Sequence, residues 1–282
     1  MDKAEAKGKQ HESWTLVAPG WGKYDPLMRT WAAPVTERMI ALAAIREGSR
    51  VLDIACGAGE PALAVAEKVG PKGSVLATDF VEEMVGFARS KAKAHALSNI
   101  EFRCVDGEVI DAPAGSFDAV TMRWGLMFMP DPVACMRRVN AALRPGGKAV
   151  VCCWTEAADN PFVTVPLGVL KRHMVVPEPP AGAPGIFALA SPDRLHAIFA
   201  EAGFHDVAIE QVTIPMADFP TGAEYDVFIR ELAGPVASLF VQLPADVQAR
   251  VKQEIARDAE MHSSKPGRVY LQGITHVVVG TK

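Results

Sequence analysis

The amino-acid sequence predicts an α/β fold in which a mainly parallel sheet carries helices on both faces. Apolar segments that suit buried strands recur at about residues 50–54, 74–79, 100–105, 116–122 and 147–154. Helical segments alternate with them at about residues 60–69, 81–95 and 131–143. This alternation is typical of a parallel sheet, because each helix returns the chain to the edge where the next strand begins.

The first strand runs into a glycine turn and then into a helix, in the segment VLDIACGAGEPALAVA at residues 51–66. Asp53 stands near the carboxyl end of the strand, Gly57 and Gly59 form the turn, and Pro61 suits the first position of the helix. Glycines let the backbone approach a ligand closely, and a helix N-terminus offers free N–H groups. The segment therefore predicts a site for a nucleotide-like cofactor.

Asp79 ends the second strand about 20 residues after Gly59, a distance at which a carboxylate accepts hydrogen bonds from a ribose. The spacing of Gly57, Gly59 and Ala62 also fits the dinucleotide fingerprint, so a nicotinamide-dependent oxidoreductase is one alternative. A second alternative is a binding module that keeps the cofactor but transfers nothing. A third is an ordinary strand–helix turn, in which Asp79 only caps the next helix.

Four motifs together favour a different cofactor. They are DIACGAGEPA, ATDFVEEMVGFAR, VDGEVIDAPAGSFDAVTMRWGLMFMPDP and ALRPGGKAVV. Over about residues 35–155 they resemble the class I S-adenosylmethionine-dependent methyltransferases, in the small-molecule branch that includes the ubiquinone/menaquinone-biosynthesis enzymes. Ala55 stands where a first glycine is common in that family. The resemblance implies a Rossmann-like, seven-stranded, mostly parallel sheet with an antiparallel last strand, helices on both faces and a helical lid and cap.

The resemblance also implies which residues hold S-adenosylmethionine. Asp79 would accept from the ribose hydroxyls, and Asp106 would accept from the adenine amino group. Arg123 and Trp124 would lie against the methionine end. The full implied set is Asp53, Ala55, Cys56, Gly57, Gly59, Asp79, Phe80, Met84, Asp106, Gly107, Glu108, Arg123 and Trp124.

The chain outside these motifs divides into a lid, an insert and a cap. We expect an N-terminal helical lid at 1–47, a cofactor-binding core at 48–155, an insert at 156–190, core again at 191–214, a helical cap over the acceptor pocket at 215–272 and a final core strand at 273–282. The insert holds PEPPAGAPG at 177–185, which excludes a regular helix or a central strand.

Trp14, Trp21, Tyr24 and Trp31 all lie in the lid segment. They form either an aromatic cover over the cofactor and the acceptor or a helix pair packed on the core. The stretch GWGKYDP at 20–26 is punctuated by glycines and predicts a loop. We therefore expect Trp21 and Tyr24 to reach the pocket.

A sulfonium-bound methyl group is already activated, so the protein mainly holds a nucleophile in line with it and keeps water out. A base is needed only where the acceptor must lose a proton, and His173, Tyr24 and Glu156 are the candidates, the first two preferred. The residues expected to line an apolar acceptor pocket, or else to fill the core beneath the cap, are Met127, Phe128, Met129, Phe162, Met174, Phe187 and Phe228. The sequence therefore predicts methyl transfer by in-line displacement to a small apolar or aromatic metabolite.

Composition and hydropathy indicate which partners and which cellular location to expect. A net charge of −4 over 282 residues argues against a general nucleic-acid surface. The polar N-terminus is unlike a secretory signal, and no apolar run is long enough to cross a bilayer. The five cysteines lack the spacing of a metal site, and Cys104, Cys152 and Cys153 fall in apolar strands. We expect a cytoplasmic protein with buried thiols, no metal and a small-molecule methyl acceptor.

Overall fold

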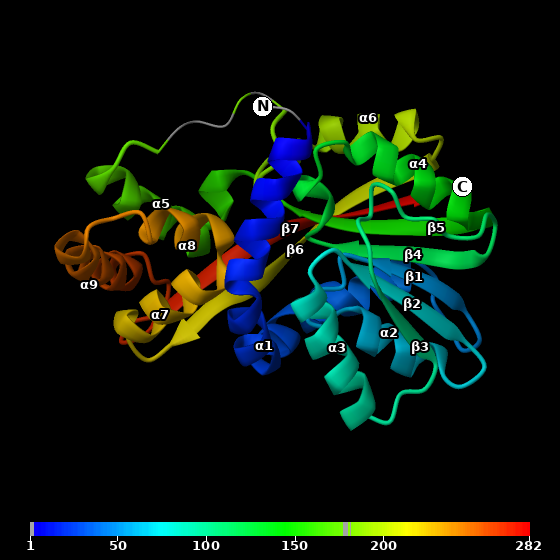
Figure 1. The fold of residues 1–282 in the computed structure, drawn as a ribbon, viewed down its shortest axis with the longest axis horizontal. Coiled ribbons are helices and arrows are strands. Elements are labelled where there is room, and N and C mark those ends of the chain that lie inside the picture. The colour runs from blue at the N-terminus through cyan, green and yellow to red at the C-terminus, as the bar shows by residue number, and fades with distance from the viewer. Residues whose placement is uncertain (1–2, 177–179, 181) are drawn as a thin grey trace.

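The computed structural model describes residues 3–176, 180 and 182–282. Within them the strands form one seven-stranded sheet in the order β3-β2-β1-β4-β5-β7-β6 (Figure 1). The strands are β1 (Arg50–Ile54), β2 (Ser74–Asp79), β3 (Ile100–Cys104), β4 (Phe117–Arg123), β5 (Leu143–Trp154), β6 (His205–Phe219) and β7 (Val269–Thr281). Strand β7 runs antiparallel to both neighbours, whereas β1 to β5 pair in parallel. The predicted fold class is confirmed.

The central strands are apolar because both of their faces are covered. All residues of β1 after Arg50 are buried, and β4 is buried except at Asp118. Continuous burial of this kind is usual for strands inside a parallel sheet. Strand β3 lies at the sheet edge, where Cys104 is exposed, so the expectation of a buried thiol there is wrong. The thiols of Cys152 and Cys153, on β5, are buried as expected.

The helices that follow the strands begin and end close to the predicted limits. They are α2 (Ala62–Val69), α3 (Glu82–Ala94), α4 (Pro132–Ala142) and α6 (Pro192–Glu201), with the short 3₁₀ helices η1 (Leu126–Phe128) and η2 (Ala157–Asp159). The Asp131 carboxylate caps α4 by accepting a hydrogen bond of 2.9 Å from the backbone N–H of Ala134. Pro61 lies one residue before α2, at the cap position, and not at its first position.

The lid segment is one continuous helix, α1 (Lys3–Leu42), which runs across the middle of the molecule in Figure 1. The loop expected at 20–26 is therefore wrong. Prolines and glycines disfavour a helix interior, but tertiary packing can override that preference. A Cβ at Gly20 would lie 2.0 Å from the carbonyl oxygen of Glu231, so this glycine allows α1 to pack closely against a neighbouring helix.

The cap gathers at one end of the sheet, at the left of Figure 1. Its helices are α5 (Pro161–His173), α7 (Gly222–Leu232), α8 (Gly234–Phe240) and α9 (Ala245–Met261). Strand β6 continues to Phe219 and β7 starts at Val269, so the helical part is shorter than the expected 215–272. Of the Pro/Gly-rich stretch, residues 177–179 and 181 lie outside the described residues. Among the described helices, none has the length and apolar character that a membrane span requires.

Candidate functional site

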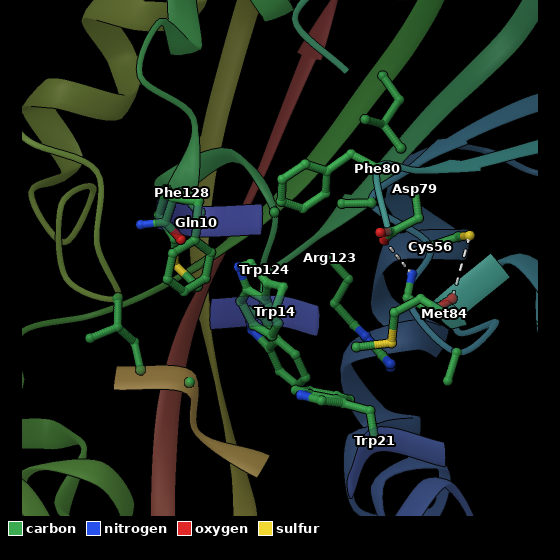
Figure 2. A pocket seen from close by; sticks show the side chains of 18 of the residues that line it. Gln10, Trp14, Trp21, Cys56, Asp79, Phe80, Met84, Arg123, Trp124 and Phe128 are labelled. Carbon is green, nitrogen blue, oxygen red and sulfur yellow. Dashed lines mark hydrogen bonds between the residues drawn. The ribbon is translucent and has the colours of Figure 1, made fainter. Parts of the chain in front are cut away.

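A cavity lies between the carboxyl ends of the central strands and the helix α1 (Figure 2). Asp79, Asp106 and Arg123, which end or follow three different strands, all line it, as their shared position at strand ends predicted. The predicted cofactor residues that line the cavity are Ala55, Cys56, Gly57, Asp79, Phe80, Met84, Asp106, Gly107, Glu108, Arg123 and Trp124. Asp53 is fully buried behind this lining.

The glycine turn exposes its backbone to the cavity. Ala55, Gly57 and Gly59 have φ angles of 57°, 52° and 118°. A glycine adopts these conformations without strain, which explains why one is common at the position of Ala55. A Cβ built on Gly57 would meet no protein atom within 4 Å other than those of its chain neighbours, so the space beside this residue is open to a ligand.

The Asp79 carboxylate is held in place by two backbone N–H groups. Its Oδ2 accepts from Gly57 at 2.9 Å, and its Oδ1 accepts from Val81 at 3.0 Å. Val81 is the cap residue of α3, so Asp79 joins the glycine turn to the start of that helix. Burial raises the pKa of Asp79, although these N–H groups act in the opposite direction.

The Asp53 carboxylate lies beneath the turn with one oxygen unpaired. Its Oδ1 accepts a hydrogen bond of 2.5 Å from the Thr121 hydroxyl. Its Oδ2 is buried and has no hydrogen-bond partner among the described residues. Burial raises the pKa of Asp53 to about 7. Burial thus favours the protonated form of this carboxyl.

The Arg123 guanidinium connects three elements around the cavity. It donates to the Thr36 hydroxyl of α1 at 2.9 Å and to the Glu60 carbonyl of the turn at 3.2 Å. Its carbon Cζ lies 4.9 Å from the centre of the Trp124 ring. Burial lowers the pKa of Arg123, but an arginine stays charged over the accessible pH range.

Trp124 adopts a φ of 58°, which is rare for a bulky residue and is a form of backbone strain found at functional sites. Two contacts hold it there. Its indole N–H donates to the Thr275 hydroxyl at 3.1 Å. Its ring stacks on Trp154 with a centroid separation of 4.6 Å and an interplanar angle of 15°.

Helix α1 forms the roof of the cavity with one continuous face. Its lining residues are Lys7, Gln10, Trp14, Trp21, Asp25, Met28 and Arg29. These positions recur at helical spacing, so they share one side. In Figure 2, Trp14 and Trp21 lie lower in the view than Asp79 and Cys56. Tyr24 instead packs edge-on against Phe228, with 5.0 Å between the ring centres.

Sequence reasoning missed two ion pairs at the roof. Lys91 lies 2.5 Å from the Asp25 carboxylate, and Arg29 lies 3.4 Å from the Glu60 carboxylate. Asp25 and Arg29 stand four residues apart, which is a helical signal, but the glycines and proline at 20–26 concealed it. Glu60 directly follows the glycine turn, and its position there could have indicated a role.

The other half of the cavity is apolar. Met127, Phe128, Met129 and Phe162 line it, as predicted. Further apolar lining comes from Trp154, Ile186, Met216, Ile229, Leu232 and Pro235. Phe228 is instead buried in the core among other aromatic rings, and Met174 and Phe187 pack on the core outside the lining. These three residues therefore fit the alternative expectation, that they belong to the core beneath the cap; Phe228 is buried, and Met174 and Phe187 are partly buried.

The predicted proton acceptors lie away from the described lining. His173 ends α5, and its Nε2 lies 3.1 Å from the Glu254 carboxylate of α9. Glu156 is exposed just before η2. Tyr24 lies on the core side of α1, as described above. The acid–base roles of His173 and Tyr24 remain predictions.

Comparisons with known proteins place this geometry among methyltransferases. The profile of the ubiE/COQ5 methyltransferase family matches residues 27–177. The demethylmenaquinone methyltransferase of Staphylococcus carnosus is 30% identical over 234 residues, which are 75% of this chain and 91% of that protein. The enzyme of the same name from Lactococcus lactis is 38% identical over 132 residues, 47% of this chain and 50% of that protein.

Two solved structures share the fold. The YcgJ protein of Bacillus subtilis superimposes with a TM-score of 0.59 at 22% identity, over 88% of this chain and 97% of that one. Phosphoethanolamine N-methyltransferase 2 of Haemonchus contortus, solved with S-adenosyl-L-methionine, gives a TM-score of 0.52 at 18% identity, over 86% of this chain and 50% of that one.

Proposed function

We propose that the methyl acceptor of this chain is a flat, apolar small molecule of the quinol type. The chain belongs to the ubiE/COQ5 methyltransferase family and uses S-adenosylmethionine as its methyl donor. The observation that carries this proposal is the cavity itself. Its one half has open backbone and carboxylates, and its other half is apolar and aromatic. Family membership also decides against the nicotinamide cofactor that the glycine spacing left open.

The donor half fits S-adenosylmethionine. The space left beside Gly57 and the carboxylates of Asp79 and Asp106 in the lining suit a cation that carries hydroxyl and amino groups. We propose that Asp79 accepts from the ribose and that Asp106 accepts from the adenine amino group. The donor supplies a methyl group that leaves its sulfonium with both bonding electrons staying on sulfur.

The acceptor half suits a ring with few polar groups. Trp124 and Trp154 are stacked at the boundary between the two halves, and Phe128 faces the cavity from η1. Binding a flat nucleophile against these rings would align it with the methyl group and exclude water. The two relatives described above are named as demethylmenaquinone methyltransferases, which supports a quinol-like acceptor.

A ring carbon that gains a methyl group must then lose its proton. His173 and Tyr24 were predicted for this step, and we add Glu60, because it lines the cavity and burial raises its pKa. We further propose that α1 acts as the lid and that α5, α7, α8 and α9 act as the cap. A cytoplasmic location is consistent with five free cysteines.

Methyl transfer to defined acceptors tests the proposal. The purified chain is incubated with S-adenosylmethionine and a reduced naphthoquinol that bears a short isoprenoid tail, and in parallel with phosphoethanolamine. We expect the mass of the quinol to rise by one methylene unit, and phosphoethanolamine to stay unchanged. Transfer to the amine alone would reject the quinol-type acceptor.

Donor binding is measured separately by calorimetry with S-adenosylhomocysteine. We expect Asp79→Ala to weaken binding by more than about tenfold, which is 1.4 kcal/mol. The exposed Asp246, in the first turn of α9, supplies the control Asp246→Ala, which should leave binding unchanged. Donor binding without transfer to any acceptor would favour the non-catalytic module.

A further inference from the structure

The first turns of α1 are held over the cavity by charged contacts. The Lys7 ammonium contacts the Asp106 carboxylate and lies 2.5 Å from that of Glu108. Both carboxylates line the cavity at the end where the strand β3 finishes. A single side chain of the roof thus connects directly to the floor.

These contacts belong to a larger network that joins three elements. The Glu108 carboxylate also accepts a hydrogen bond from the backbone N–H of Asp131. Asp131 caps α4 and lies 2.7 Å from the Lys3 ammonium. Lys3 and Lys7, one helical turn apart, therefore link α1 to the loop after β3 and to the start of α4.

The rest of α1 is attached in a different way. Among residues 3–13, only Ala6 is buried. From Val17 onward the helix carries buried side chains, Gly20 packs against the backbone of α7, and the Trp21 indole donates to the Leu232 carbonyl at 3.0 Å. The early turns are thus mostly exposed and carry the ion pairs of Lys3 and Lys7, whereas the later turns are fixed by apolar packing.

The early turns also contact both halves of the cavity. His11 contacts Phe80, in the donor half, edge-on with ring centres 5.5 Å apart, and Trp14 contacts Phe128, in the apolar half, in the same way at 5.0 Å. Beneath this cover, Asp79 is 7% exposed and Glu108 is 8% exposed. These contacts place the early turns of α1 over the carboxylates that are expected to bind the donor.

We propose that Lys7 is a positioning residue, whose two ion pairs hold residues 3–14 of α1 closed over the donor and so set how long the donor and its demethylated product stay bound. Opening requires the Lys7 ammonium to leave both carboxylates and the exposed Lys3–Asp131 pair to break, while the helix beyond Val17 stays in place. Screening by salt weakens ion pairs between partly exposed groups, so release accelerates as ionic strength rises. The inference rests on the proposed donor site. It does not depend on the identity of the acceptor, so it would stand if the quinol-type acceptor were rejected.

The test measures the dissociation rate of S-adenosylhomocysteine by stopped-flow tryptophan fluorescence, with Trp14 and Trp21 as reporters in the roof. We expect Lys7→Met to raise this rate about five-fold at low salt and to reduce its dependence on salt, while the Lys3–Asp131 pair remains. Lys7→Arg should restore both the slow rate and the salt dependence. The matched control is Lys9→Met, because Lys9 is 62% exposed and pairs with Glu5 within the helix.

Two results would overturn the proposal. One is a dissociation rate in Lys7→Met equal to that in Lys9→Met, with the salt dependence undiminished. The other is slower dissociation in Lys7→Met, which would mean that Lys7 competes with the ligand for Asp106. Circular dichroism distinguishes both from unfolding of α1, since the helical signal of Lys7→Met should equal that of Lys9→Met.

Discussion

Ala55 and Gly125 meet where the glycine turn approaches the segment after β4, so closely that a Cβ on Gly125 would lie 2.5 Å from the Cβ of Ala55. The methyl group of Ala55 thus takes the space that a side chain at position 125 would need. Gly125 has a φ of −100°, so the clash, and not backbone conformation, requires a glycine there.

This relationship predicts a non-additive pair of substitutions. We expect Gly125→Ala to lower the free energy of unfolding by about 1–3 kcal/mol, as overpacking does. Adding Ala55→Gly removes the opposing methyl group and should recover more than half of that loss. Urea unfolding of the four proteins of the double-mutant cycle measures the coupling. Strictly additive effects would show that the two residues do not compete for space.

The buried Asp53 predicts how stability depends on pH. Its folded pKa is about 7, above the ordinary value of 3.8, so the folded protein holds a proton that the unfolded chain releases at lower pH. The stabilising effect of that proton is present at pH 4 and is lost as pH rises toward 7. Asp53→Asn should therefore gain stability relative to wild type between pH 4 and 8, by about 1–4 kcal/mol.

Urea unfolding of both proteins at several pH values checks this, and the difference between them cancels the titrating groups that do not interact with Asp53. The Thr121 hydroxyl donates to the Asp53 carboxylate and can donate equally to the amide oxygen of an asparagine. A stability difference that stays constant over this pH range would mean that Asp53 titrates near its ordinary pKa.

A charged substitution in the apolar half of the cavity should weaken binding of the acceptor but not of the donor. Ile186 is partly exposed and lines the cavity, so Ile186→Glu would place a charge where a flat apolar ring is expected to bind. We expect the KM for the quinol to rise at least about tenfold. The affinity for S-adenosylhomocysteine should stay the same. Val175, which is 89% exposed and outside the lining, supplies the control Val175→Glu. Equal effects of the two variants would remove Ile186 from the acceptor site.

The positions of Glu60 and His173 predict that Glu60, and not His173, is the proton acceptor. Glu60 lines the cavity, whereas His173 lies against Glu254. We expect Glu60→Gln to lower kcat by about 10²-fold or more, within the range of general-base effects, and His173→Gln to leave it near wild type. Steady-state kinetics with saturating donor measures both. The reverse order would restore His173 as the base, and wild-type rates in both would assign the proton to solvent.

The local sequence was sufficient to predict the sheet and the site residues at the carboxyl ends of its strands. Apolar strands, the turn at Gly57 and the carboxylates Asp79 and Asp106 are all set within short stretches of chain. Parallel strands then bring their ends together whatever the details of packing. This is why the predicted donor residues, except Asp53 and Gly59, meet in one cavity.

Only the tertiary structure determined that α1 covers the cavity and which contacts hold it there. The sequence indicated a loop at 20–26, because glycine and proline disfavour a helix and nothing local reveals that Gly20 packs on the carbonyl of Glu231. The pairing of Lys7 with Asp106 joins residues far apart in the chain, so no periodicity records it. Local physics thus determined which backbone and carboxylates face the donor. Long-range packing determined what closes over them, because a helix with three interior prolines is stable only against the elements that it covers.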